Sequence, residues 1–214
     1  MEVHGKDVRK GTKIPYMVHL LGVCALVLLD EGKETEAIAA LLHDTLEDHP
    51  EQVTATSIEE QFGTEVLSII QGCSDTSPDY RGGPKPPWKE RKQYYLNHLE
   101  ELFTGSNSRG NGADSAPTYP PSETLAVSIL RVSLADKVDN VRSMVKDYRE
   151  DGEAFWERFN AGKEDQIWYL ASLLDVYHKG HERLKKDKFL LEEFKRSFEE
   201  LKQLAGYNSS TEQV

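Results

Sequence analysis

No stretch of this sequence is apolar for long enough to cross a bilayer. A membrane-spanning helix needs about 20 predominantly apolar residues, whereas ALVLLD, the most apolar piece of the first half, is interrupted by Asp30 and Glu31. The N-terminal segment MEVHGKDVRKG is charged and has no apolar centre, which excludes a secretory signal. We therefore expect no membrane partner.

Cysteine is scarce. Cys24 and Cys73 are the only two cysteines, and they do not form a CxxC pair. Cys24 lies in an apolar helical stretch, where a buried and reduced thiol is expected. We therefore predict a cytoplasmic protein.

Basic residues are fewer than acidic ones: the chain has 26 Lys and Arg and 37 Asp and Glu, which gives a net charge of −11. A general nucleic-acid binder needs a basic field to displace counterions, so this class is excluded. An enzyme that cleaves phosphates meets the same difficulty with its anionic substrate. Such an enzyme needs a metal ion and a local basic cluster to reverse the field.

The period-two alternation typical of strands is missing, and the pattern predicts an all-α protein. At 214 residues the chain is long enough for one well-buried domain. We expect helices over 15–30, 34–48, 57–62 and 65–71, about six turns from Thr124, one through Trp168 and Val176, and one over 185–204. Ser57 is the expected N-cap of the third helix, with Glu60 completing a capping box.

Two segments are dense in turn-forming residues. Residues 77–92 form a Pro/Gly-rich loop that ends in a basic helix start, and 105–123 has almost no apolar content. We expect the second to be a mobile insertion. The predicted organisation is a main domain over 1–182, a C-terminal amphipathic helix over 183–205 and a disordered tail over 206–214.

HDTLED, at positions 43 to 48, has the residue types of a metal site. His43 and Asp44 are adjacent and about 100° apart around a helix, so their side chains can converge on one ion. Imidazole and carboxylate ligands suit Mn²⁺, Fe²⁺ or Mg²⁺, which lower the pKa of bound water. Glu47 and Asp48, one turn along, can then orient or deprotonate that water. The alternative is a solvated acidic helix end.

Three further residues accompany this motif. His19 lies upstream, and its alternative role is that of a half-buried helix histidine. Asp136 lies in the apolar stretch SILRVSLAD, where an unpaired carboxylate is costly to bury, and Asn140 follows one turn later. A salt bridge with Lys137 or Arg131 is the alternative for Asp136.

The order His19, His43-Asp44, Asp136 resembles the HD superfamily of metal-dependent phosphohydrolases. The segments RKGTKIPYMVH (9–19), HDTLED (43–48) and LADKVDN (134–140) are more narrowly similar to the RelA/SpoT hydrolase domain, including small alarmone hydrolases. The similarity covers about residues 4–178. It implies a single all-α HD-domain helical bundle with a Pro/Gly-rich active-site loop.

The resemblance also implies a site and a reaction. One divalent ion, usually Mn²⁺ with Fe²⁺ or Mg²⁺ as alternatives, would be held by His19, His43, Asp44 and Asp136. Glu47 and Asp48 would position or activate the attacking water. The reaction of such domains is removal of the 3′-pyrophosphate from guanosine tetra- or pentaphosphate.

Matched to the family motif, Arg9 and Lys10 would meet the guanine base and the phosphates, with Thr12 beside them and Asn140 near the ribose. Arg is planar and stacks on a base, whereas Lys is a point charge for phosphate. Solvated surface charge is the alternative for both basic residues.

The required basic cluster is present in the sequence. The motifs place eight basic residues near the metal: Arg9, Lys10, Lys13, Lys89, Arg91, Lys92, Lys137 and Arg142. We assign Arg91 and Lys92 to substrate binding. The acid excess lies elsewhere, notably in 51–65, 147–157 and the C-terminal helix. Trp88 either stacks on a base of the substrate or packs against other side chains of the protein.

Some departures from the family pattern stand out. Asp139 occupies a position where relatives often carry His, and only eight residues precede the RKG segment, so that either the chain is shortened or the C-terminal helix covers that surface. Two other functions stay open, an HD phosphohydrolase for another nucleotide such as a deoxynucleotide or NADPH, and a non-catalytic nucleotide-sensing module. A homo-oligomer also stays open.

Overall fold

The computed structural model describes residues 3–76, 83–105, 122–185 and 188–207. Most of the predicted insertion (105–123) and tail (206–214), and part of the 77–92 loop, lie outside these residues. The predicted all-α class is confirmed, because the described residues contain helices and only an isolated bridge between Val8 and Pro15. No described helix has the length and apolarity required to cross a membrane.

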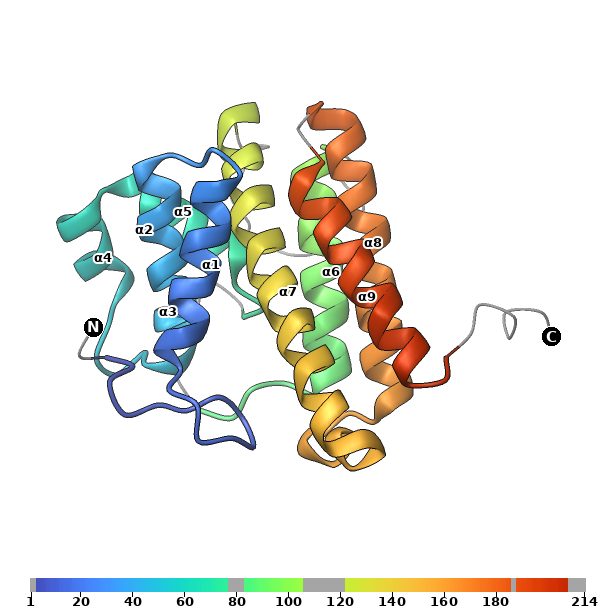
Figure 1. The fold of residues 1–214 in the computed structure, drawn as a ribbon. Helices are drawn as coiled ribbons and strands as arrows, with labels where there is room; N and C mark the ends of the chain where they lie inside the picture. Colours follow the sequence, from blue (N-terminus) through green and yellow to red (C-terminus); the bar gives the residue numbers. More distant parts are fainter. Residues whose placement is uncertain (1–2, 77–82, 106–121, 186–187, 208–214) are drawn as a thin grey trace.

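The helices stand in two groups around one long helix (Figure 1). Their bounds are α1 (Met17–Leu29), α2 (Glu34–Leu42), α3 (Thr45–Asp48), α4 (Ala55–Phe62), α5 (Thr64–Cys73), α6 (Trp88–Thr104), α7 (Glu123–Asp151), the 3₁₀ helix η1 (Gly152–Arg158), α8 (Lys163–Leu184) and α9 (Phe189–Leu204). Helix α7 packs against α1, α2 and α5 on one side and against α6, α8 and α9 on the other. It therefore joins the two groups.

Helix α7 is central because its apolar residues are buried along its length. Val132, Val138 and Val141 are fully buried, and the Ser122 side chain caps the helix by accepting a hydrogen bond from the Leu125 amide. The helix has 29 residues, about eight turns instead of the six predicted. Asp136 lies near the middle of this helix, which packs against α1 and α2.

The continuous helix predicted over 34–48 is wrong, because it breaks between α2 and α3. The His43 Nδ1 atom donates to the Ala40 carbonyl at 2.8 Å, and the Thr45 hydroxyl donates to the Leu42 carbonyl at 2.6 Å. Such local side-chain bonds compete with the backbone bonds of a helix. The break leaves His43 and Asp44 in a turn.

The predicted N-cap at Ser57 is also wrong, by three residues. Thr54 caps α4 by accepting a hydrogen bond from the Ser57 amide at 3.1 Å, and the Ser57 hydroxyl accepts from the Thr54 amide at 3.1 Å. Ser57 therefore supplies the second half of the capping box, the place the prediction gave to Glu60.

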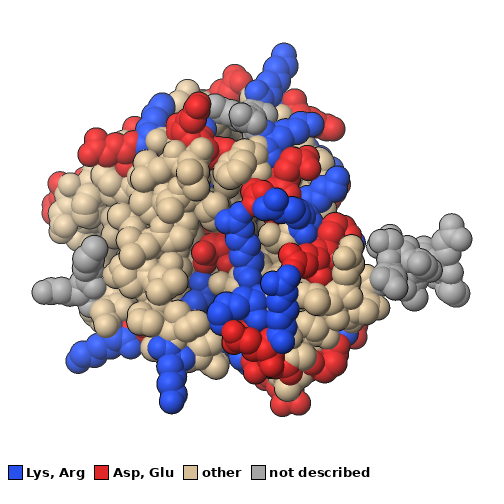
Figure 2. Space-filling model, viewed as in Figure 1, with Lys and Arg blue, Asp and Glu red and all other residues tan. Residues whose placement is uncertain are grey.

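Helix α9 begins later than the predicted 185 and packs on α7 and α8. The side chains of Leu191, Phe194 and Leu201 are fully buried there. Figure 2 shows mixed charges over α7 and α9 and a largely uncharged area toward α1. The predicted domain limit at 182 stays a prediction, and α8 runs on to Leu184.

The N-terminal segment before α1 forms a turn closed by backbone bonds. The Arg9 amide donates to the Ile14 carbonyl at 2.9 Å, and the Tyr16 amide donates to the Asp7 carbonyl at 2.8 Å. Gly11 has a φ of +73°, and a Cβ atom there would lie 2.7 Å from the Arg158 side chain. Only glycine fits this turn without strain.

We expect the attachment of this segment to depend on pH. The Asp7 carboxylate accepts hydrogen bonds from His4 Nδ1 at 2.9 Å and His49 Nε2 at 2.7 Å. The His49 hydrogen bond lowers the pKa of Asp7. Burial alone would lower the pKa of His49, but the bond to Asp7 raises it above its ordinary value.

The raised pKa of His49 contributes stability that is complete below about pH 6.5 and is lost as pH rises through the folded value. The lowered pKa of Asp7 contributes stability above about pH 3.9 that is lost as pH falls. Amide exchange of residues 4–10, corrected for intrinsic rates, should therefore be slowest between these limits and faster at pH 8.5. The His49→Gln variant should lose this dependence. Equal protection at pH 6 and pH 8.5 in the wild type would contradict the assignment.

Candidate active site

Four ligand-type side chains from three distant parts of the chain meet at one point. His19 comes from α1, His43 and Asp44 from the turn between α2 and α3, and Asp136 from α7. His19 Nε2 lies 3.3 Å from Asp136 Oδ1 and 3.7 Å from Asp44 Oδ2. His43 Nε2 lies 3.0 Å from Asp44 Oδ2 and 3.7 Å from Asp136 Oδ1. Neighbouring donors bound to one ion at about 2.1 Å lie about 3.0–3.4 Å apart, so the distances of 3.0 and 3.3 Å fit one ion and the two of 3.7 Å must shorten by a few tenths of an ångström.

Both imidazoles are oriented toward this point from behind. His19 Nδ1 donates to Asp139 Oδ2 at 2.7 Å, and His43 Nδ1 donates to the Ala40 carbonyl. Metal-binding histidines typically have such a carboxylate or carbonyl behind them. Among the described residues, the buried Nε2 atom of His43 has no hydrogen-bond partner. The donor set therefore fits a divalent ion.

The protonation of the four groups follows from their mutual charges. Burial alone would lower the pKa of His19 and of His43, but the carboxylates beside them raise both pKa values above their ordinary range. Burial opposes ionisation of Asp44 and Asp136, yet His43 lowers the pKa of the first and Lys137 that of the second. Without an ion, both imidazoles therefore hold a proton to higher pH than a free imidazole does, and a metal must compete with that proton.

Asp136 faces the two imidazoles as a metal ligand would, and it also forms a salt bridge with Lys137. Its Oδ2 atom accepts from Lys137 Nζ at 2.5 Å, and Oδ1 accepts from Asn140 Nδ2 at 2.5 Å while also facing the two imidazoles. Arg131 instead pairs with Asp30 and Glu36. His19 is not half-buried, because only 2% of it is exposed.

Two residues that contact the cluster have no role in the sequence prediction. The Tyr16 hydroxyl donates to Asp44 Oδ2, and burial together with the Asp44 charge raises the pKa of Tyr16. Asp139 accepts from His19 Nδ1 and, at 2.8 Å, from Arg9 Nη1. Asp139 lies three residues after Asp136, on the same face of the helix, and this spacing is the sequence signal that could have identified Asp139 as a neighbour of the cluster.

Glu47 and Asp48 lie beside the cluster. Burial, a hydrogen bond with Asp75 and the charges of Asp75 and Asp44 raise the pKa of Glu47 to about 9. Burial and the Asp44 charge also raise the pKa of Asp48. Lys85 Nζ lies 4.0 Å from Glu47 Oε1 and 4.0 Å from Asp48 Oδ1. These acids thus lie between the cluster and an amine that the sequence did not indicate.

Asp75 is a further residue that the sequence did not indicate. Both of its oxygens lie 2.6 Å from Arg91 Nη1, and Oδ2 lies 2.5 Å from Lys92 Nζ. Burial would raise the pKa of Asp75, but the hydrogen bond with Glu47 and then the charges of Lys92 and Arg91 lower it. Asp75 therefore fixes the positions of both predicted substrate-binding residues.

A cavity of about 400 Å³ adjoins the cluster. Tyr16, Lys137 and Asn140 line it, and each is hydrogen-bonded to Asp44 or Asp136. The other residues that line the cavity are Arg9, Lys10, Trp88, Arg91, Lys92, Ser143, Met144, Asp147, Phe155, Arg158, Phe159, Gln166, Tyr169 and Leu170. Its wall is therefore partly basic and partly aromatic and apolar.

Of the predicted substrate residues, Thr12 does not line the cavity. Its hydroxyl donates to the Arg9 carbonyl at 2.9 Å and accepts from the Ile14 amide at 3.1 Å, so it holds the turn that carries Arg9. Arg9 and Lys10 do line the cavity, and Lys10 Nζ lies 5.9 Å from the centre of the Phe159 ring.

The basic cluster differs in part from the expected one. Lys13 does not line the cavity, while Lys89 and Arg142 pair with Asp165 and Glu193. Arg158, which follows an acidic stretch in sequence, lines it instead. Trp88 both lines the cavity and packs, with its ring edge-to-face on Tyr169 at 5.7 Å.

The fold and the His–Asp cluster together define a class. Residues 1–105 match the family model described as "HD domain". The chain therefore carries an HD-type domain, as the resemblance implied. Its curated relatives include proteins named guanosine-3′,5′-bis(diphosphate) 3′-pyrophosphohydrolase and putative GTP diphosphokinase.

Over 74 residues, 34% of this chain, it is 47% identical to the guanosine-3′,5′-bis(diphosphate) 3′-pyrophosphohydrolase of Aquifex aeolicus. That alignment covers 10% of the Aquifex protein. The curated relatives that the chain matches are much longer proteins, of which it spans 10–15%.

Two solved structures share the fold. The crystal structure of lmo0812 from Listeria monocytogenes superposes with a TM-score of 0.61 and 22% identity, covering 88% of this chain and 94% of that one. The structure titled as a metazoan orthologue of SpoT that hydrolyses ppGpp gives a TM-score of 0.58 and 20% identity, covering 97% and 91%. At these identities the likeness concerns the fold.

Proposed function

We propose that this chain is a metal-dependent phosphohydrolase that removes the 3′-pyrophosphate from guanosine tetra- and pentaphosphate. The observation that carries the proposal is the convergence of His19, His43, Asp44 and Asp136 beside a basic cavity. The name of the Aquifex relative and the SpoT-like structure support the choice of substrate.

The four converging residues would hold one divalent ion, for which we propose Mn²⁺, with Fe²⁺ or Mg²⁺ as alternatives. When bound, such an ion lowers the pKa of water and neutralises phosphoryl oxygens. Asp139 and the Ala40 carbonyl keep the two imidazoles in the required orientation. Tyr16 does the same for Asp44.

We assign proton transfer to Glu47 and Asp48. The raised pKa of Glu47 means that, despite the Lys85 amine 4.0 Å away, it carries a proton at neutral pH while the four-residue cluster holds no ion. A positive charge at the cluster favours its carboxylate form. Oε1 of Glu47, buried without a hydrogen-bond partner among the described residues, can then accept the proton of the attacking water. Asp48, the more exposed acid, would orient that water.

The cavity supplies the contacts for the substrate. The Arg9 guanidinium is held by Asp139 and by Asn140 Oδ1, at 2.8 and 3.1 Å, and its planar face suits a purine base. Lys10, Arg91 and Lys92 present positive charge for phosphates on the same wall. The volume lies within the range of small-molecule sites.

Product analysis tests this function directly. Purified protein with Mn²⁺ should convert ppGpp to GDP and pyrophosphate, which separate by ion-exchange chromatography. Turnover of a deoxynucleotide or NADPH with none of ppGpp would keep the class and replace the substrate. Binding of ppGpp without any turnover, in metal-loaded protein, would instead identify a sensing module.

The Asp139→Asn variant should weaken Mn²⁺ binding by about 10–100-fold, because Asp139 orients the His19 imidazole and favours its Nε2 as ligand. KM should rise as well, since Arg9 loses its ion pair. Calorimetric titration with Mn²⁺ and steady-state kinetics separate the two effects. Asp165→Asn, in a surface pair with Lys89, is the matched control. Unchanged Mn²⁺ affinity in Asp139→Asn would remove Asp139 from this role.

A further inference from the structure

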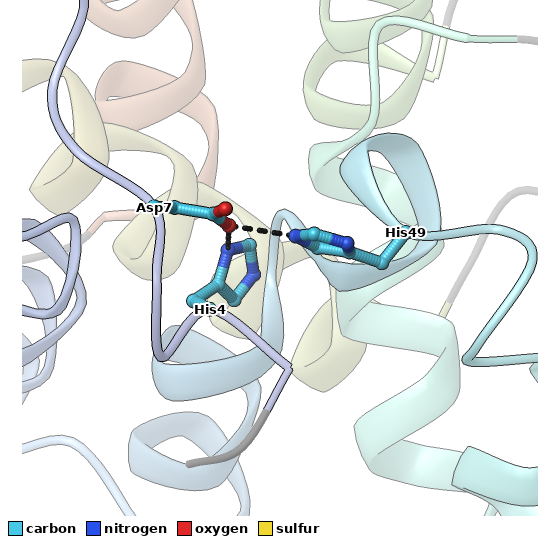
Figure 3. Close-up of side chains that lie close together, drawn as sticks. All are labelled: His4, Asp7 and His49. Atoms are coloured by element: carbon cyan, nitrogen blue, oxygen red, sulfur yellow. Dashed lines mark hydrogen bonds and ion pairs between the residues drawn. The ribbon is translucent and has the colours of Figure 1, made fainter.

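A second group of ligand-type side chains lies apart from the four-residue cluster. His4 and Asp7 belong to the N-terminal segment, and His49 directly follows α3 (Figure 3). We propose that these three residues form a second divalent-metal site, of the zinc type, which fastens the N-terminal segment to the end of α3.

The donor atoms already converge. Asp7 Oδ2 lies 2.9 Å from His4 Nδ1 and 2.7 Å from His49 Nε2, and the three donor atoms all lie within 4.8 Å of one another. Donors around a tetrahedral zinc ion lie about 3.3 Å apart, so Asp7 Oδ2 must move away from both imidazoles by roughly half an ångström, and the two imidazole donors, within 4.8 Å of each other, must close to the same spacing. Asp7 is 36% exposed and can make this movement.

The surroundings of both imidazoles support ligation. Behind His49, Nδ1 lies 3.5 Å from Glu51 Oε1, so that a carboxylate faces the ring nitrogen opposite the donor atom. His4 is buried and its ring stacks on Tyr16 at 5.1 Å, which holds Nδ1 toward Asp7. The open side at Asp7 leaves room for water, as in sites with three protein ligands.

The donor set selects the ion. Two imidazoles and one carboxylate suit a borderline ion such as Zn²⁺, and a given site binds Zn²⁺ more tightly than Mn²⁺. Mg²⁺ and Ca²⁺ prefer sites made of oxygen atoms. This site has one carboxylate ligand, whereas the cluster around His43 has two.

An ion at this place would act on the neighbouring active site. The segment that starts at Asp7 continues to Arg9 and Lys10 in the cavity wall, and His49 follows Asp48. The ion would therefore hold the substrate-binding segment and the acids in a fixed relation. It would do so with bonds that replace the present hydrogen bonds between Asp7 and the two histidines.

Zinc titration of the metal-free chain against a chromophoric chelator tests the proposal. The wild type should bind two equivalents of Zn²⁺, and His49→Gln and Asp7→Asn should each bind one. The His178→Gln variant, which removes a half-buried histidine on α8, should still bind two. Glu51→Gln should weaken the second equivalent by about tenfold. In the wild type, Zn²⁺ should slow amide exchange of residues 4–10.

The Asp44→Asn variant separates this site from the other one. It should keep the equivalent that depends on His49, and Asp44→Asn/His49→Gln should bind no tight Zn²⁺. Equal stoichiometry and affinity in wild type, His49→Gln and Asp7→Asn would overturn the second site even if ppGpp is hydrolysed. Two equivalents without hydrolysis of ppGpp would support the site and count only against the proposed function. Far-UV circular dichroism verifies that each variant is folded.

Discussion

The Asp44→Asn variant should hydrolyse ppGpp about a thousandfold more slowly than the wild type. Asp44 Oδ2 lies 3.0 Å from His43 Nε2 and accepts the Tyr16 hydroxyl, so the variant loses one anionic ligand at the centre of the cluster. An ion that stabilises the transition state by about 4 kcal/mol corresponds to about three powers of ten in rate. The measurement is kcat with ppGpp at saturating Mn²⁺, together with the Mn²⁺ dissociation constant.

The Asp175→Asn variant is the control, because this carboxylate lies on the surface of α8 and pairs with Lys179. Its kcat should equal that of the wild type. Wild-type turnover and Mn²⁺ affinity in Asp44→Asn would show that the convergence of the four residues is not a metal centre. Loss of Mn²⁺ affinity with retained turnover would show that the ion is not needed for the reaction.

The Arg131→Met variant should lower the free energy of unfolding by about 3 kcal/mol, the usual cost of breaking a buried ion pair. Arg131 Nη1 lies 2.7 Å from both oxygens of Glu36, and its Nε lies 2.9 Å from Asp30 Oδ2. Glu36 is only 1% exposed, so its carboxylate would lose its cation without gaining water. Urea unfolding at neutral pH measures the effect.

The double variant Arg131→Met/Glu36→Gln should recover part of the lost stability, because it removes the buried Glu36 charge, although Asp30 still loses its bond to Arg131. Arg196→Met is the exposed control, and it should change the unfolding free energy little. Turnover per folded molecule should stay at the wild-type level, since Arg131 lies outside the cavity wall. An unfolding free energy equal to that of the wild type would mean that this ion pair adds nothing to stability.

Local pattern determined the helical class and the ligand types. Apolar spacing at helical period predicted α1, α5 and α7, and the motifs around His19, His43-Asp44 and Asp136 named the side chains that the fold brings together. Both kinds of signal extend over a few residues only. The helix ends were less accurate, because hydrogen bonds from His43 and Thr45 overrode a continuous helical pattern.

Tertiary structure alone decided the partners of the charged residues. Asp139 meets Arg9 across 130 positions, Arg131 pairs with Glu36, and Asp75, which lies after the end of α5, meets Arg91 and Lys92 of α6. The sequence around a carboxylate in a helical stretch is the same whichever cation pairs with it in the folded protein, so that sequence does not identify the partner. Its partner follows from the packing of α1, α2 and α5 on α7, which the periodicity of one segment does not encode. The same packing sets Asp7 against His49, and with it the second group of ligands.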